Sequence, residues 1–360
     1  MKGYKAFEKG LVCRGKQYAE NTVFEEDKAE ICESGMHFCK NPLDVLDYYP
    51  LVDANGNMTE FAEVEALDEV LTDDDKKFCT KKLKVGAKLS IAEFVKASFE
   101  VTKENIEKEA TNKKTKDKDE LTKTGGYSAN LVGGYSAKLV GGDWANLVGG
   151  NSANLVGGDS AKLVGGDWAK LVGGNSANLV GGNSANLVGG YSANLVGGYS
   201  AKLVGGDWAN LVGGNSANLV GGYSANLVGG NSANLVGGYS AKLVGGNSAN
   251  LVGGNSANLV GGDWANLVGG DWAKLVGGNS AKLVGGNSAN LVGGEHSIMI
   301  AENESIVKGK KGSLLVLVER EWQGDEYIIK SFKTQIIDGE KIKEDTFYKL
   351  ENGEFVEVTE

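Results

Sequence analysis

The chain has 360 residues, of which 55 are Gly and only 2 are Pro, and its formal net charge is −10. This composition excludes an ordinary globular protein and indicates a periodic chain. Neither nucleic acid nor an anionic membrane is expected as a partner, because both require a basic surface. The N-terminus shows no signal peptide and no run of 18 apolar residues follows it, so we expect a cytoplasmic protein.

Residues 1–100 predict an α+β domain. Its expected elements are strands near Lys2–Phe7 and Glu60–Leu67, and helices near Pro42–Tyr49 and after Ser90. Pro42 suits the first turn of a helix, and Ser90 with Glu93 forms a capping box before an apolar run. In residues 101–124 almost every second residue is charged, which predicts a solvated helix or linker.

From Gly125 to Val292 the chain consists of 21 consecutive copies of Gly-Gly-x-x-Ala-x-Leu-Val, and two degenerate copies continue to Lys308. The third residue of each perfect copy is Tyr, Asn or Asp, the fourth is Ser or Trp, and the sixth is Asn or Lys. A period this strict predicts a β-solenoid. We expect the Gly pair to form the sharp turn between strands by adopting positive φ.

Side-chain alternation places the fifth and seventh residues of each copy on one face of the strand. The sixth residue varies between Asn and Lys, which a narrow interior could not accept, so the Ala and Leu are expected to point inward. Two repeats would close a flattened coil of 16 residues between two parallel sheets, and a triangular coil of three repeats is the alternative. The predicted interior includes Ala145, Leu147, Ala209, Leu211, Ala265 and Leu267.

The open ends of a solenoid recruit other chains unless they are capped. Residues 309–360 predict a small β-rich cap with strands at Leu314–Val318, Tyr327–Phe332 and Lys333–Ile337. The whole chain is therefore predicted to be mainly β, with an octapeptide-repeat β-solenoid over residues 125–308 between the N-terminal domain with its linker and this cap.

Aromatic residues are expected on the outside of the solenoid, where they can stack on sugars or on another copy. The eighth-position Val, if it also points outward, forms apolar ladders that favour lateral self-association. We therefore expect a homo-oligomer formed through apolar and aromatic faces or through the end caps. The surface aromatic residues include Trp144, Trp168, Trp208, Trp264, Trp272, Tyr135 and Tyr199.

Three resemblances bear on function. The first rests on Cys13-Arg14-Gly15, the stretch from Cys32 to Cys39, Asn41-Pro42-Leu43-Asp44 and the stretch from Phe61 to Leu67. These segments resemble an uncharacterised domain family of phage and prophage proteins, which implies a virion-associated or prophage setting and no established activity. The repeat is similar to that of bacterial ice-nucleation proteins, which implies stacked coils of two eight-residue halves. Asn, Lys and Val stand where those proteins carry outward Thr ladders, so the surface expected to order ice is missing.

The third resemblance is to the ADP-ribosyltransferase fold, and it rests on the order Arg14-Gly15, Gly35-Met36-His37-Phe38, Tyr48 or Tyr49, and Glu63 or Glu65. It implies that Arg14 or His37 would hold the ribose of NAD, that Tyr48 would stack on nicotinamide, and that Glu65 would polarise the ribose. In the alternative interpretation, Glu63 and Glu65 are simply the solvated face of a half-buried strand.

A zinc site built from Cys13, Cys32, His37 and Cys39 is a further possibility, but the spacing matches no standard zinc knuckle. Buried reduced thiols explain the cysteines better, so we expect neither a metal nor a cofactor. We interpret the chain as a non-enzymatic structural or interaction protein of phage or prophage type, used for spacing, display or self-assembly. The alternatives are an ADP-ribosyltransferase-like enzyme on a repeat stalk and an ice-binding protein.

Overall fold

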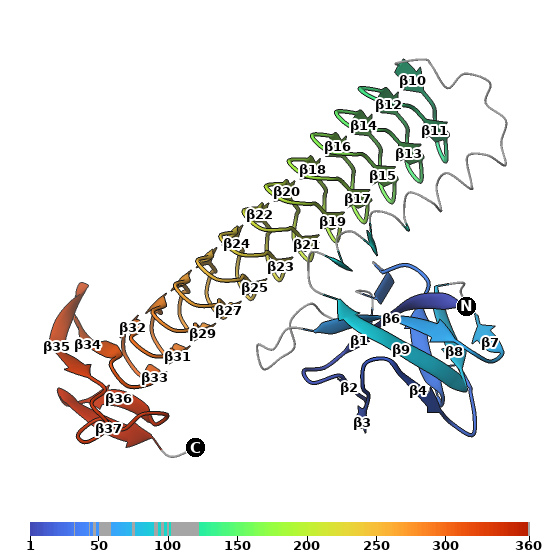
Figure 1. Cartoon of the computed structure of the whole chain (residues 1–360). Helices are drawn as coiled ribbons and strands as arrows, with labels where there is room; N and C mark the ends of the chain where they lie inside the picture. The colour runs from blue at the N-terminus through green and yellow to red at the C-terminus, as the bar shows by residue number, and fades with distance from the viewer. Residues whose placement is uncertain are drawn as a thin grey trace. The chain divides into compact units, whose positions relative to one another are not determined.

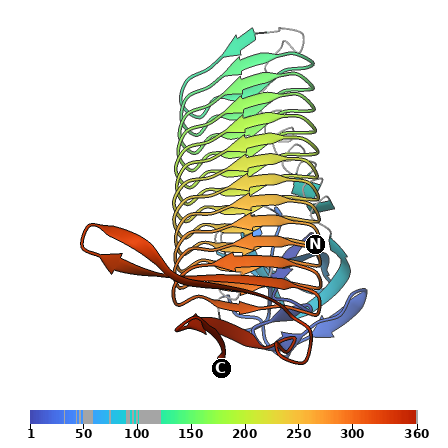
Figure 2. The same ribbon diagram turned by 90° about the vertical axis from the view of Figure 1, so that its left-hand side faces the viewer.

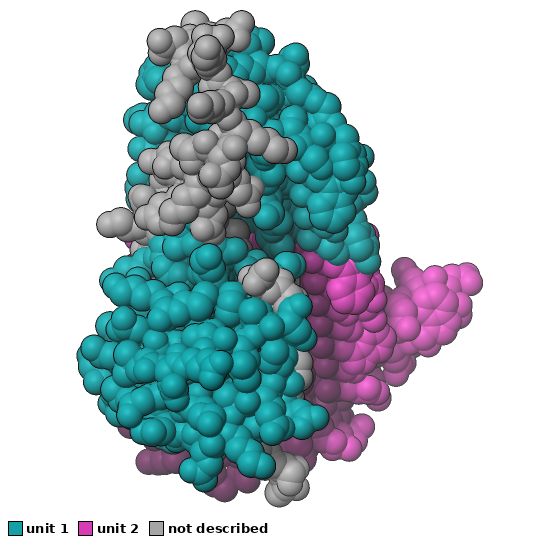
Figure 3. All heavy atoms as spheres, turned by 90° about the vertical axis from the view of Figure 1, so that its right-hand side faces the viewer, with its two compact units in different colours: residues 1–202 teal, residues 203–360 magenta. Residues whose placement is uncertain are grey.

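The computed structural model describes residues 1–31, 33–42, 44–45, 48–49, 59–73, 76–89, 93–94, 97–98, 101 and 122–358 (Figure 1). The contacts divide the chain into two compact units, residues 1–202 and residues 203–360, and the boundary falls inside the repeats (Figure 3). No helix in the described part of the chain is long and apolar enough to cross a membrane.

The N-terminal domain is built on a seven-stranded antiparallel sheet in the order β4-β9-β6-β1-β5-β8-β7. A separate hairpin pairs β2 with β3. Buried side chains such as Phe7, Met36 and Leu83 form the core against the sheet. The strands are β1 (Lys2–Phe7), β2 (Val12–Cys13), β3 (Lys16–Gln17), β4 (Thr22–Glu25), β5 (Met36–Cys39), β6 (Glu60–Ala66), β7 (Val70–Thr72), β8 (Lys77–Thr80) and β9 (Lys82–Leu89).

The strands expected near residues 2–7 and 60–67 are present as β1 and β6, but the domain contains more strand than the sequence predicts. After Ser90, the described residues 93–94, 97–98 and 101 are helical, and the ring of Phe94 stacks on Phe61 with 4.3 Å between centroids. Of the helix expected over Pro42–Tyr49, residues 44–45 form a short 3₁₀ turn, and residues 43, 46 and 47 lie outside the described part.

The solenoid makes about 12 turns between residues 122 and 317. Its strands begin with β10 (Thr122–Thr124), and β11 to β31 are the sixth to eighth residues of successive copies, from Asn130–Val132 to Asn290–Val292. The degenerate copies supply β32 (Ile298–Ala301) and β33 (Ile306–Lys308). Even-numbered strands build one parallel sheet, here the first sheet, and odd-numbered strands build the second sheet (Figures 1 and 2).

Each strand pairs with the strand two copies away, so that Leu139 lies beside Leu155 in the first sheet and Leu147 beside Leu163 in the second. Two repeats therefore make one coil, and the three-repeat alternative is wrong. The fifth-position Ala and seventh-position Leu fill the space between the sheets. The side chains of Ala145, Leu147, Ala209, Leu211, Ala265 and Leu267 are each 0% exposed.

The glycine pair does not adopt positive φ, so that prediction is wrong. Instead, the fourth residue of all 21 perfect copies adopts positive φ, between 51° and 62°, although this residue is Ser or Trp. Glycine is required because of space. A Cβ on Gly221 would lie 2.5 Å from the Cβ of Ala225, and one on Gly222 would collide with the side chain of Asp207 in the coil before it. Real Cβ atoms do not approach this closely.

Polar side chains join successive coils along the outside. A third-position carboxylate or amide oxygen accepts the backbone N–H of the third residue one coil later, as from Asp159 to Asp143 at 2.9 Å. Sixth-position amides donate to one another in the same way, at 2.9 Å from Asn250 to Asn234 and from Asn266 to Asn250. Such amide ladders stabilise stacked parallel strands, which explains why Asn and Asp dominate these two positions.

The C-terminal segment continues both sheets. The hairpin of β34 (Leu314–Gln323) and β35 (Glu326–Ile336) extends the first sheet beyond β32, and the hairpin of β36 (Phe347–Glu351) and β37 (Glu354–Val358) extends the second beyond β33. The two strands expected at Tyr327–Phe332 and Lys333–Ile337 are therefore one strand. Figure 2 shows the end of the β34–β35 hairpin projecting beyond the coils.

Candidate interaction surface

The outward face of the first sheet changes character at its C-terminal end. In the repeats the sixth position is Asn or Lys, but the register from Lys282 continues through Ile298, Leu314 and Ile336. The eighth-position ladder continues in parallel from Val284 to Ile300 and Val316. The sixth-position ladder thus becomes apolar beyond the last perfect repeat, where it runs beside the apolar eighth-position ladder.

A β-bulge at Lys330 gathers more apolar side chains onto the same face. Ser331 pairs with Glu319 and Ile329 pairs with Arg320, so β35 has one extra residue and its alternation reverses there. If every residue of β35 alternated regularly, Ile329 and Tyr327 would point to the opposite side of the hairpin from Phe332, because successive residues of a strand face opposite ways. The bulge brings them onto one face.

We call the resulting surface the C-terminal apolar face. Its five large, most exposed side chains are 55–69% exposed, and the rings of Trp322 and Tyr327 meet edge to face with 5.0 Å between centroids. Its apolar members are Ile300, Leu314, Val316, Val318, Trp322, Tyr327, Ile329, Phe332 and Ile336, and the same register places Arg320 and Thr334 on this face.

The basic residues of this hairpin are paired with carboxylates. Arg320 bonds Glu302 at 2.9 Å, Lys330 lies 3.9 Å from Glu321, and Lys333 pairs with Glu354. The hairpin therefore shows little uncompensated positive charge. Its second strand, β35, is also the last strand of its sheet among the described residues, and an edge strand offers backbone groups to another chain.

Farther along the solenoid, the first sheet exposes a regular apolar ladder. The eighth-position valines from Val140 to Val284 on this sheet are 37–44% exposed. Aromatic side chains are also exposed, and Tyr223 stacks on Tyr239 with 5.3 Å between ring centroids. The predicted surface aromatics Trp144, Trp168, Trp208, Trp264, Trp272, Tyr135 and Tyr199 are 50–72% exposed.

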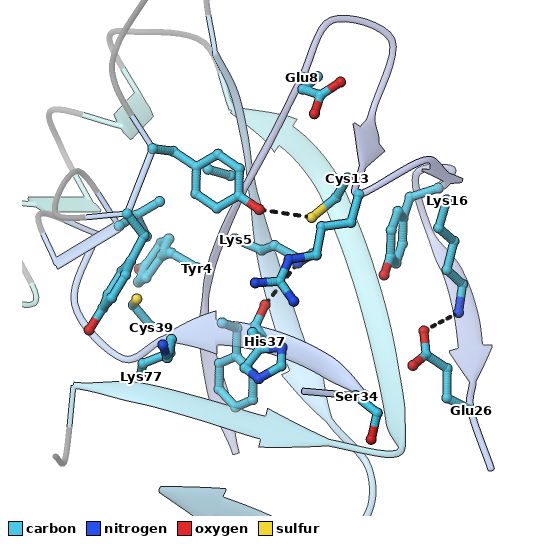
Figure 4. A pocket seen from close by; sticks show the side chains of 18 of the residues that line it. Tyr4, Lys5, Glu8, Cys13, Lys16, Glu26, Ser34, His37, Cys39 and Lys77 are labelled. Carbon is cyan, nitrogen blue, oxygen red and sulfur yellow. Dashed lines mark hydrogen bonds and ion pairs between the residues drawn. The ribbon is translucent and has the colours of Figure 1, made fainter. Parts of the chain in front are cut away.

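The residues of the enzyme hypothesis are only partly brought together. Arg14, His37 and Tyr48 line one cavity of about 500 Å³ in the N-terminal domain (Figure 4). Glu65 is not among its lining residues. Glu63 is also absent from the lining, and on β6 both carboxylates alternate with the buried Val64 and its neighbours.

The described residues contain no cluster of side chains that matches the zinc hypothesis. Cys13 and Cys39 are buried, form no disulfide within the described ranges and line the same cavity as His37. Cys32 lies outside the described residues. Within the described ranges, no group of three His, Cys, Asp or Glu side chains is arranged to hold a metal ion.

The sequence interpretation missed the C-terminal apolar face because it divided β35 into two strands. The signal was available in the stretch from Tyr327 to Ile336. Tyr327 and Ile329 stand at odd positions, beside Ile328, whereas Phe332 and Ile336 stand at even positions. Such a change of phase within a strand is typical of a bulge.

Comparison with known proteins assigns no activity. Residues 1–97 match the model of a family described as Domain of unknown function (DUF7666). No curated protein and no solved structure matches the chain. The structure therefore defines the molecule as a β-solenoid that carries an N-terminal domain of unknown function and a C-terminal β cap.

Proposed function

We propose that this protein is a structural protein that self-associates through its C-terminal apolar face. The observation that carries the proposal is the set of large side chains, from Trp322 to Ile336, that the hairpin presents to solvent on one side. Soluble monomers rarely expose contiguous apolar patches of this kind, and such patches mark interaction sites.

A second copy of the chain suits this face better than other partners do. Two identical faces related by a twofold axis place apolar side chains against apolar side chains. Because Arg320, Lys330 and Lys333 are already paired with carboxylates, the two copies bring together few uncompensated charges. An acidic or nucleic-acid partner would find no free basic stripe on this hairpin.

The solenoid has the role of a spacer in this proposal. The interior of its perfect repeats is apolar and successive coils are joined by backbone pairing and Asn ladders, so the number of repeats sets the length of the solenoid. The resemblance of the N-terminal domain to phage and prophage proteins is the basis for proposing such a setting, in which the spacer would display that domain.

Sedimentation equilibrium of the full chain across a hundredfold range of concentration tests the proposal. We expect the wild-type chain to form a dimer, and the double variant Ile329→Glu, Phe332→Glu to be monomeric over the same range. Both residues are at least 60% exposed, so the substitutions should leave the fold intact, which far-UV circular dichroism checks.

The matched control is Val23→Glu, which changes an apolar residue that is 45% exposed on the N-terminal domain. It should dimerise like the wild-type chain. A wild-type chain that is monomeric throughout, or a double variant that dimerises as well as the control, would overturn the proposal.

A further inference from the structure

Lys5 is a buried cation at the floor of the N-terminal cavity. It lies on β1, is 4% exposed, and its Nζ donates a hydrogen bond of 2.9 Å to the backbone carbonyl of His37 (Figure 4). The ammonium also lies over the rings of Phe7 and Tyr18, at 5.5 and 5.6 Å from their centroids. Among the described residues, no carboxylate forms an ion pair with it. Buried charges in proteins are normally paired.

Arg14 brings a second cation to the same cavity. It occupies the two-residue loop of the β2–β3 hairpin with Gly15, between the paired residues Cys13 and Lys16. Both loop residues have positive φ, 51° for Arg14 and 75° for Gly15, which is the type I′ turn that suits such hairpins. Asn is the residue preferred at the first position of this turn, so an Arg there is not explained by the turn. Within the described ranges, the guanidinium has no carboxylate partner.

Burial lowers the pKa of Lys5, so an oxyanion bound beside it would favour the charged ammonium. Burial lowers the pKa of His37, and the neighbouring cations Lys5, Arg14 and Lys77 lower it further. The acidic lining residues do not cancel these charges at the floor: Glu26 is paired with Lys16 at 2.6 Å, and Glu8 and Glu33 are exposed. The hydroxyl of Tyr49, 3.0 Å from the Sγ of Cys13, adds a neutral polar group.

We propose that this cavity binds the phosphate or carboxylate group of a small molecule between Lys5 and Arg14. An ammonium and a guanidinium that converge on one space match such an oxyanion, and guanidinium groups bind carboxylate and phosphate oxygens in a bidentate manner. The cavity volume of about 500 Å³ lies in the usual range for small-molecule sites. Tyr18, Tyr48 and Tyr49 in the lining would contact the remainder of the ligand.

Isothermal titration calorimetry of the full chain tests the site with three probes: inorganic phosphate, acetate and phenyl phosphate. We expect saturable binding of one ligand per chain for at least one probe, and the preference among the three separates a phosphate from a carboxylate ligand and shows the contribution of an aromatic group. The variant Arg14→Asn removes the charge while keeping a residue that favours the turn. It should weaken binding at least about tenfold, the effect of losing a charged hydrogen bond.

Lys9→Gln is the matched control, because it removes one exposed positive charge from the same domain outside the cavity lining. It should bind within about twofold of the wild-type chain, since exposed distant charges are screened. A second variant, Lys5→Met, keeps the shape of the buried side chain and should also lose binding. The inference is overturned if none of the probes binds saturably, or if Arg14→Asn and Lys5→Met bind as tightly as the control.

Discussion

The repeats and the end domains of this chain reach their folds in different ways. In the repeats, a strand pairs with a copy of itself that lies 16 residues away, as Asn234 does with Asn218. In the N-terminal domain, Lys2 pairs with Glu65 and Tyr4 with Cys39, and no local pattern indicates these partners. A periodic sequence therefore determines its own register, whereas the end domains depend on contacts between unrelated segments.

The largest effect is expected from a charge placed inside the solenoid. Leu211→Asp should reduce the free energy of unfolding by about 4 kcal/mol or more, because Leu211 is 0% exposed and the carboxylate would have no partner there. Asn210→Asp should cost at most about 1 kcal/mol, since a carboxylate oxygen can still accept the hydrogen bond from Asn226. Urea denaturation followed by circular dichroism measures both. Equal stability of the two variants would mean that the assigned faces are reversed.

A smaller effect separates two explanations of the glycine pair: lack of space for a Cβ atom, and a need for positive φ. Gly221→Ala should destabilise the chain by about 1–3 kcal/mol, because the added Cβ would lie 2.5 Å from Ala225. Ser224→Gly in the same turn should be neutral or stabilise by up to about 1 kcal/mol, because Ser224 has φ of 51° and glycine adopts this conformation without strain. The opposite order in urea denaturation would restore the conformational explanation.

The solenoid could be predicted from the sequence down to its interior, because the invariant Ala and Leu alternate with variable positions. The positive φ at the fourth residue could not, since Ser and Trp are not residues that favour it. The cavity shows a similar limit: Arg14, His37 and Tyr48 were identified from their order in the chain, but the separation of Glu65 depends on the register of β1 with β6. The bulge at Lys330 is indicated in the sequence by the change of phase between Ile329 and Phe332. It was missed because this segment was predicted as two short strands.

The smallest expected effect is the absence of an enzyme activity. The full chain should convert NAD no faster than a buffer control, because Glu65 is not among the residues that line the cavity of Arg14 and His37. Chromatographic measurement of nicotinamide release tests this. NAD cleavage that disappears in both Arg14→Ala and Glu65→Ala would favour the ADP-ribosyltransferase alternative instead.

The most direct test of self-association through the C-terminal apolar face uses the bulge itself. Inserting one Ala between Glu319 and Arg320, opposite Lys330, restores regular pairing and should turn Ile329 and Tyr327 away from Phe332. Deleting Lys330 removes the extra residue and its charge but keeps the observed pairs, and with them the shared face. We expect the insertion to weaken dimerisation at least about tenfold in sedimentation equilibrium, and the deletion variant to dimerise like the wild-type chain, because burial of two large apolar side chains contributes more than about 1.4 kcal/mol. Equal dimer affinity of the two variants would contradict the account.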